Sequence, residues 1–192
     1  MAGAKNLKAR PKATPSRIQE NIQVKQAIVD NSIVENDYVH IAETEELNIN
    51  DLPVGNISVP LNLWLDNKDA LTSRDGLTAV QIAADETTED LADDLNNIDI
   101  VVLPFVSYVD GRSYSHAYKL RTRFNFKGQI RAIGDVHFDQ LDFLTRSGCD
   151  AFELPEGDNL EAALRAFNEF SDVYQPSADD GKLIFSRRRT VH

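Results

Sequence analysis

The chain has 192 residues, of which 42% are hydrophobic and 27% charged, and its formal net charge is −11. This composition is typical of a soluble globular protein with one core, and the acidic excess argues against a general nucleic-acid binder. No apolar run approaches the roughly 18 residues that a membrane span needs, and the single cysteine, Cys149, excludes an internal disulfide or a cysteine zinc cage, so we expect a cytoplasmic protein.

Both ends of the chain are basic, although the body is acidic. Residues 1–17 hold three lysines, two arginines and no acid, and three arginines stand at 187–189. The first of these segments also lacks the apolar stretch of a secretory signal. We therefore expect a disordered basic tail over residues 1–21, a single domain over residues 22–175 and a flexible tail over residues 176–192.

The first predicted elements are strands. β-Branched residues on both sides of Asp30-Asn31 predict a small β hairpin, and a further short strand is expected at Tyr38–Ile41. Ile57–Val59 is a brief strand, and Pro60 suits the first turn of a helix through LNLWLDNKDAL. The strand Thr78–Ala83 follows, with a helix expected in TTEDLADDLNN.

The second half continues to alternate strands and helices. Asp99–Phe105 is too continuously apolar for an edge strand, which indicates the centre of a parallel sheet. A helix follows the Asp110-Gly111 turn, and Gln129–Ile133 is the next strand. The helix expected at 137–147 has Phe138, Leu141 and Leu144 on one face, and Gly148 in the usual cap position ends it.

A strand at Ala151–Leu154 and a helix capped by Asp158 or Asn159 complete the pattern. Alternating strands and helices imply right-handed crossovers and a parallel sheet. We expect a single α/β domain with a four- to five-stranded, mainly parallel sheet and flanking helices, preceded by the hairpin. An open doubly wound sheet is favoured over a curved, partial-barrel-like sheet, although the pattern fits both.

Polar residues gather where these strands end, the usual place for ligands in parallel sheets. After the central strand, the turn Asp110-Gly111-Arg112 leads into a helix whose first amides, with Arg112, suit an oxyanion or a protein partner. The alternative is structural, with Arg112 paired to Asp110 or Asp135. The candidate ligand-binding residues are Asp110, Arg112, Ser113, Ser115, Arg131, Asp135 and Gln140.

A candidate partner surface consists of Tyr108, Tyr118 and Arg121, although packing of the tyrosines against the core is the alternative. The four histidines lack metal-ligand spacing, and the chain has no phosphate-binding glycine loop and no GxSxG nucleophile turn. We therefore assign no metal, no cofactor and no catalytic residue. Whether the protein is an enzyme stays open.

The motifs DGRSYS, LR, RAIGDV, DQ and RSGCDAF, between residues 110 and 152, resemble the signature of a bacterial family labelled domain of unknown function, number 934. The upstream VPLNLW, residues 59–64, also fits, and the resemblance covers roughly residues 25–175. Departures are Ser113 where the family usually has glycine, Cys149 where it has phenylalanine, and Val106, Ser107 and Val109 before the turn.

The resemblance implies a role in sulfur metabolism, because members of this family are typically encoded beside assimilatory sulfite reductase and adenylyl-sulfate reductases. It implies an accessory protein of sulfate and sulfite reduction that docks to sulfite reductase or a neighbouring enzyme. Two alternatives remain: a small-oxyanion-binding enzyme or sensor that uses the Asp110-Gly111-Arg112 turn, and a structural homo-oligomer. The family carries no established catalytic residue to this chain.

Overall fold

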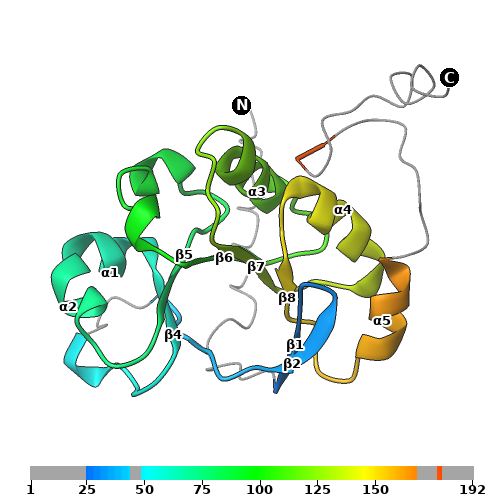
Figure 1. Cartoon of the computed structure of the whole chain (residues 1–192), viewed down its shortest axis with the longest axis horizontal. Helices are drawn as coiled ribbons and strands as arrows, with labels where there is room; N and C mark the ends of the chain where they lie inside the picture. The colour runs from blue at the N-terminus through cyan, green and yellow to red at the C-terminus, as the bar shows by residue number, and fades with distance from the viewer. Residues whose placement is uncertain (1–24, 44–48, 168–176, 179–192) are drawn as a thin grey trace, which may run out of the picture.

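A computed structural model describes residues 25–43, 49–167 and 177–178. These form a mixed α/β structure with a single sheet and flanking helices (Figure 1). The tail expected over residues 1–21 lies outside the described residues, as does the tail expected over 176–192 except for residues 177 and 178. Among the described residues, no helix combines the length and apolar character needed to span a membrane.

The sheet has eight strands in the order β2-β1-β8-β7-β6-β5-β4-β3. The six strands from β3 to β8 run parallel, whereas β1 pairs antiparallel with both β2 and β8. The strands are β1 Gln26–Val29, β2 Ser32–Glu35, β3 Val39–His40, β4 Ile57–Pro60, β5 Thr78–Gln81, β6 Ile100–Phe105, β7 Gln129–Gly134 and β8 Ala151–Phe152.

This architecture corrects the expected sheet. It is an eight-stranded half-barrel, not a sheet of four to five strands, because the hairpin joins the sheet through β1 and because β3 extends the other edge. The doubly wound alternative is wrong and the partial-barrel alternative is right. Strands β3 to β8 follow one another in chain order, so right-handed crossovers place every connecting helix on the same face. Figure 1 shows helices α1 to α5 in an arc around the strands.

A short connection explains why the sheet curls. Strands β2 and β3 lie at opposite edges of the sheet, yet only residues 36–38 separate them in the chain. Eight flat strands would span about 34 Å, at about 4.8 Å per gap. Four Cα–Cα steps reach about 15 Å at most. The two edges must therefore approach each other, and residues 36–38 cross the concave side.

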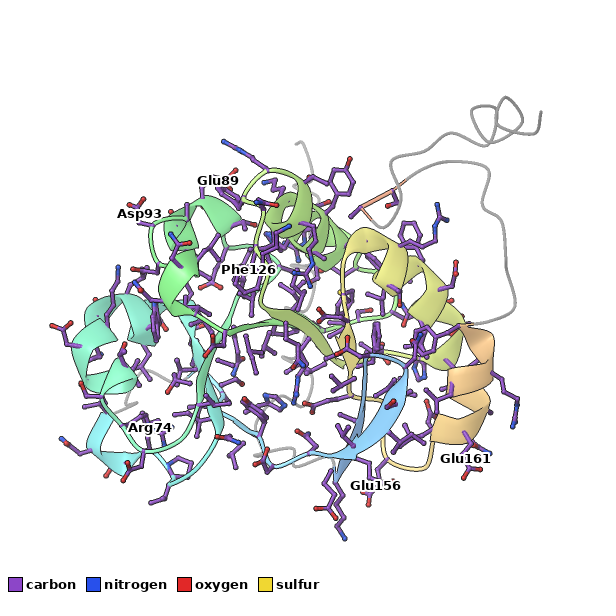
Figure 2. The ribbon with its side chains drawn as sticks, viewed as in Figure 1. Arg74, Glu89, Asp93, Phe126, Glu156 and Glu161 are labelled. Carbon is purple, nitrogen blue, oxygen red and sulfur yellow. The ribbon has the colours of Figure 1, made fainter. Side chains whose placement is uncertain are left out.

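The central strand β6 is buried on both faces, as its sequence predicts. Val101, Leu103 and Phe105 belong to the main core between the sheet and the helices. The alternate residues face the inside of the half-barrel, where Val102 packs in a second cluster with Tyr38. In Figure 2, Phe126 lies among the side chains between helices and sheet, whereas Glu89, Asp93 and Glu161 lie at the periphery.

Several local predictions are confirmed. Asp30 and Asn31 have φ of 47° and 60°, as the tight turn of a hairpin requires. Gly148 ends α4 (Leu141–Ser147) with φ of 117°, and the Asn159 side chain accepts a hydrogen bond from the Ala162 amide at the start of α5 (Leu160–Ala166). Helix α3 is longer than these two and spans Arg112–Thr122.

Two of the expected helices differ from the prediction. The helix predicted after Pro60 is broken at Asn67 into α1 (Leu61–Asp66) and α2 (Lys68–Thr72). TTEDLADDLNN forms no α-helix but two 3-10 turns, η2 (Thr88–Leu91) and η3 (Leu95–Asn97). Its four acidic residues, at positions 89, 90, 93 and 94, would repel one another at helical spacing. Two further 3-10 turns are η1 (Ile49–Asp51) and η4 (Phe138–Gln140), the latter leading into α4.

The end of β7 provides a test of this packing. Gly134 has φ of 95°, and a Cβ atom there would lie 2.5 Å from the backbone oxygen of Phe105. We expect Gly134→Ala to lower the free energy of unfolding by about 1 to 3 kcal/mol through backbone strain alone, and further through the clash. The matched control is Gly157→Ala, because Gly157 has φ of 102° and open space around it. Equal losses in urea denaturation would contradict the clash.

Candidate functional site

A buried ion pair lies inside the half-barrel. Arg131, on the inner face of β7, donates from Nη1 to Glu153 Oε1 and to Asn36 Oδ1, each at 2.9 Å. The guanidinium also lies 4.5 Å from the centre of the Tyr38 ring, and the Arg131 and Glu153 side chains are 5% and 2% exposed. The partner of Arg131 is therefore Glu153 and not a residue of the Asp110-Gly111-Arg112 turn.

Further polar side chains extend from this ion pair to strands β3, β4 and β5. Glu153 Oε2 lies 2.9 Å from His40 Nε2, and His40 Nδ1 lies 2.6 Å from Ser58 Oγ. Gln81 Nε2 donates to the same Ser58 oxygen at 2.8 Å. The Ser58–His40–Glu153 connectivity is that of a hydrolase triad. Ser58 is fully buried, however, so we assign the network to holding the strands together.

The Asp110-Gly111-Arg112 turn, at the exit of β6, is closed by its own ion pair. Arg112 donates to Asp110 from Nη2 at 2.6 Å and from Nε at 3.0 Å, and the Arg112 amide donates to Asp110 Oδ1 at 3.1 Å. These hydrogen bonds lower the pKa of the Asp110 carboxyl from 3.8 to about 2. The arrangement matches the structural alternative, in which Arg112 pairs with Asp110.

The next candidate residues hold the turn to its neighbours. Ser113 is buried, and its hydroxyl donates to the Pro104 carbonyl at 3.0 Å, which ties α3 to β6. Asp135 accepts from the Tyr108 amide at 2.7 Å. Gln140 is buried and bonds to the His137 amide and the Tyr114 hydroxyl, whereas Ser115 is exposed.

The three predicted partner-surface residues have different surroundings. Tyr108 is half exposed, and its hydroxyl donates to Asp139 at 2.8 Å, which raises its pKa. Tyr118 is half exposed on α3. The Arg121 guanidinium points inward, where it donates to the carbonyls of Phe126, Gly128 and Gly148 and to the Asp150 carboxylate. Its contacts therefore lie within the chain.

The candidate residues therefore do not form one site. Those in the loops after β6 and β7 lie at the carboxyl ends of the strands, whereas Arg121 lies at the opposite end, beside the residues that precede β7 and β8. Arg131 lies apart from both, because its hydrogen bonds run to Asn36, Gln129 and Glu153 inside the half-barrel.

Besides the two predicted tyrosines, three exposed apolar residues near the turn were missed in the sequence, namely Val109, Phe138 and Phe143. The exposed fractions are 86% for Val109, 57% for Phe138 and 54% for Phe143. The prediction that Phe138 shares a buried face with Leu141 and Leu144 is wrong for Phe138, because it lies in the 3-10 turn η4 and not in α4. With Tyr108 and Tyr118, these three residues form what we call the rim aromatic surface.

One contact between aromatic rings joins α3 to α4 beside this surface. Tyr114 on α3 lies 4.9 Å from Phe143 on α4, between ring centres, and Tyr118 follows Tyr114 by one helical turn. Asp139 bonds to Tyr108, and Asp142 directly precedes Phe143. The rim aromatic surface therefore carries carboxylates, namely Asp135, Asp139 and Asp142.

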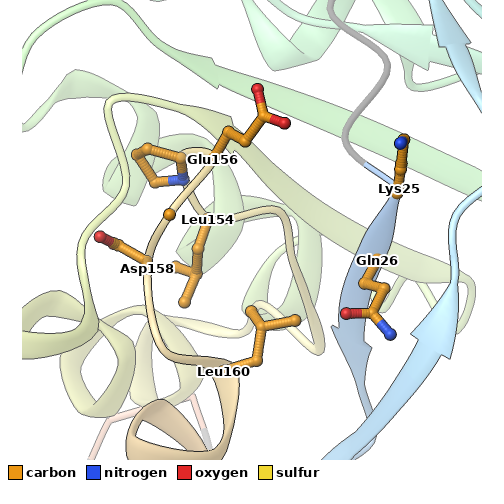
Figure 3. A pocket seen from close by; sticks show the side chains of 8 residues that line it. Lys25, Gln26, Leu154, Glu156, Asp158 and Leu160 are labelled. Carbon is orange, nitrogen blue, oxygen red and sulfur yellow. The ribbon is translucent and has the colours of Figure 1, made fainter.

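Two cavities lie near the carboxyl ends of the strands. One, of about 160 Å³, has the apolar side chains of Leu154 and Leu160 on one side and Lys25 with Gln26, the first residue of β1, on the other (Figure 3). The other, of about 200 Å³, includes Glu43 and Glu86, and burial raises the pKa of Glu86. Within the described part of the chain, no three His, Cys, Asp or Glu side chains are grouped to hold a metal ion.

Comparison with known families gives one match. A family model described as bacterial protein of unknown function (DUF934) matches residues 79–185, which is more than half of the chain. The matched segment contains strands β5 to β8, the Asp110-Gly111-Arg112 turn and the whole rim aromatic surface. No curated protein matches the chain.

The ion pair inside the half-barrel predicts that substitutions of Arg131 and Glu153 have strongly non-additive effects on the free energy of unfolding. We expect Arg131→Met to lower the free energy of unfolding by about 3 to 5 kcal/mol, because the Glu153 carboxylate stays buried without its main partner. Adding Glu153→Gln removes that charge, so the double variant should be more stable than the sum of the single losses predicts. Urea denaturation of the three variants measures the coupling, and losses that add within about 0.5 kcal/mol would contradict it.

The hydrogen bonds between Arg112 and Asp110 predict how the pKa of Asp110 changes when Arg112 is replaced. In Arg112→Gln we expect the pKa of Asp110 to rise from about 2 toward 3.8, measured by carboxyl NMR titration. Because folding lowers this pKa, the pair stabilises the fold above pH 3.8, and that stabilisation disappears as the pH falls through about 2. The control is Arg123→Gln. Arg123 directly follows α3, and the substitution removes one of the two cations paired with Glu89. An unchanged Asp110 pKa in Arg112→Gln would contradict the pairing.

Proposed function

We propose an accessory role in assimilatory sulfate and sulfite reduction for this chain, which belongs to the bacterial protein family of unknown function DUF934. The chain docks onto sulfite reductase or a neighbouring enzyme of the pathway. The docking site is the rim aromatic surface.

The observation that carries this proposal is the exposure of Val109, Phe138 and Phe143 beside two half-exposed tyrosines. Side chains of this kind are the usual anchors of protein interfaces, where they leave water and fill pockets on the partner. A single exposed apolar residue needs no explanation, whereas several such residues on neighbouring elements suit an interaction site. A protein partner is therefore the occupant that fits this surface.

The charges indicate what kind of protein surface would fit. Asp135, Asp139 and Asp142 surround the aromatic residues, and the chain as a whole carries a net charge of −11. A partner with Lys and Arg around an apolar pocket would be attracted over a long range and bind in one orientation. The oxyanion alternative receives less support, because Arg112 is paired with Asp110 and Arg131 with Glu153.

The pathway comes from the resemblance of the DGRSYS and RAIGDV motifs to a family expected beside assimilatory sulfite reductase. The same motifs build the elements under the docking surface. DGRSYS starts α3, and GDVHFDQ connects β7 to α4. The segment that carries the resemblance and the segment that carries the surface therefore coincide.

Binding to the sulfite reductase of the same genome tests the proposal. We expect Val109→Asp to weaken binding at least tenfold, because it places a charge among the aromatic anchors. The matched control is Val54→Asp, since Val54 is 92% exposed and precedes β4, whereas Val109 follows the carboxyl end of β6. Biolayer interferometry at low and high salt measures both affinities, and the wild-type affinity should fall with salt.

Two outcomes would contradict the proposal. One is the absence of binding by the wild type to sulfite reductase and to the adenylyl-sulfate reductase at micromolar concentrations. The other is equal weakening by the two substitutions. Self-association that Val109→Asp abolishes, detected by light scattering, would instead support the homo-oligomer alternative.

A further inference from the structure

Residues 177–178, which follow α5 in the chain, lie at the C-terminal end of α4, next to the segment that leads into β8. The amide of Ala178 donates to the carbonyl of Arg146 at 3.0 Å, so residues 177–178 lie at the end of α4 (Figure 1). Phe143 precedes Arg146 by three residues on the same helix, which is about 4.5 Å along its axis. The point where the described chain ends therefore lies close to the exposed Phe143.

The sequence that continues from this point begins with DDGK, residues 179–182. Leu183, Ile184 and Phe185 then form an apolar triplet, and Arg187–Arg189 follow it after one serine. The rim aromatic surface has the complementary character, with exposed rings beside the carboxylates of Asp139 and Asp142. The family match ends at residue 185 and thus includes the apolar triplet.

We propose that residues 182–189 bind the rim aromatic surface of their own chain. The apolar triplet covers Phe143 and Tyr118, and the arginines lie beside Asp139 and Asp142. The seven residues from Ala178 to Phe185 can span about 24 Å, whereas the seven-residue α4 is about 10 Å long, so the reach is sufficient.

This contact would regulate the proposed docking, and in that respect it rests on the proposed function. A tethered segment acts at a high effective concentration, so even a weak contact keeps the surface covered until a stronger partner displaces it. The basic, apolar character of the segment is the character inferred for the partner. The segment therefore competes with a partner for the same side chains.

Disulfide trapping in the full chain tests the contact directly. We expect Phe143→Cys combined with Phe185→Cys to form an intramolecular disulfide at least tenfold faster than Val54→Cys combined with Phe185→Cys. The native Cys149 should not interfere, because it is buried and burial raises the pKa of its thiol. Adding Arg187→Glu, Arg188→Glu and Arg189→Glu should make the rates of disulfide formation of the two cysteine pairs equal.

Each other outcome would overturn the proposal. Equal trapping rates for the two pairs would show no preference for the surface, and a disulfide between two chains at low protein concentration would show binding to a second copy. An advantage that survives the glutamate substitutions would contradict the arginine contacts. Trapping needs no partner, so failure of the contact and failure of sulfite reductase binding are seen in separate experiments.

Discussion

The ion pair between Arg131 and Glu153 is the interaction on which the half-barrel depends. It joins β7 to the residue after β8, and its extensions reach Asn36 on the crossing segment and His40 on the opposite edge strand. Burying two charges is costly unless each has good partners, and here the guanidinium and the carboxylate each have more than one. The sheet can therefore curl far enough for residues 36–38 to cross from one edge to the other.

The curl also determines where the rest of the protein can act. Because β3 to β8 are wound in one direction, the helices cover the outer face and the polar network and Tyr38 fill the inner one. The two cavities described above lie near the carboxyl ends of the strands. The loops after β6 and β7, with α3 and α4, present the exposed side chains of Val109, Phe138 and Phe143.

Interactions between residues close in the chain could be predicted from sequence, and those between distant residues could not. The hairpin turn at Asp30-Asn31, the Gly148 cap and the Asp110–Arg112 pair depend on residues at most a few positions apart. His40 and Glu153 are 113 positions apart, and alternating strands and helices contain no information on strand order. Phe138 was misplaced because a regular helical spacing was assumed through a 3-10 turn.

The turn that first suggested an anion site contributes mainly rigidity. Asp110 neutralises Arg112, so the charge of the arginine is compensated within the turn. Ser113 fastens the start of α3 to β6, and Asp135 fixes the backbone at Tyr108. A surface held by so many internal hydrogen bonds loses little conformational freedom on binding, and this lowers the entropic cost of docking for exposed aromatic side chains.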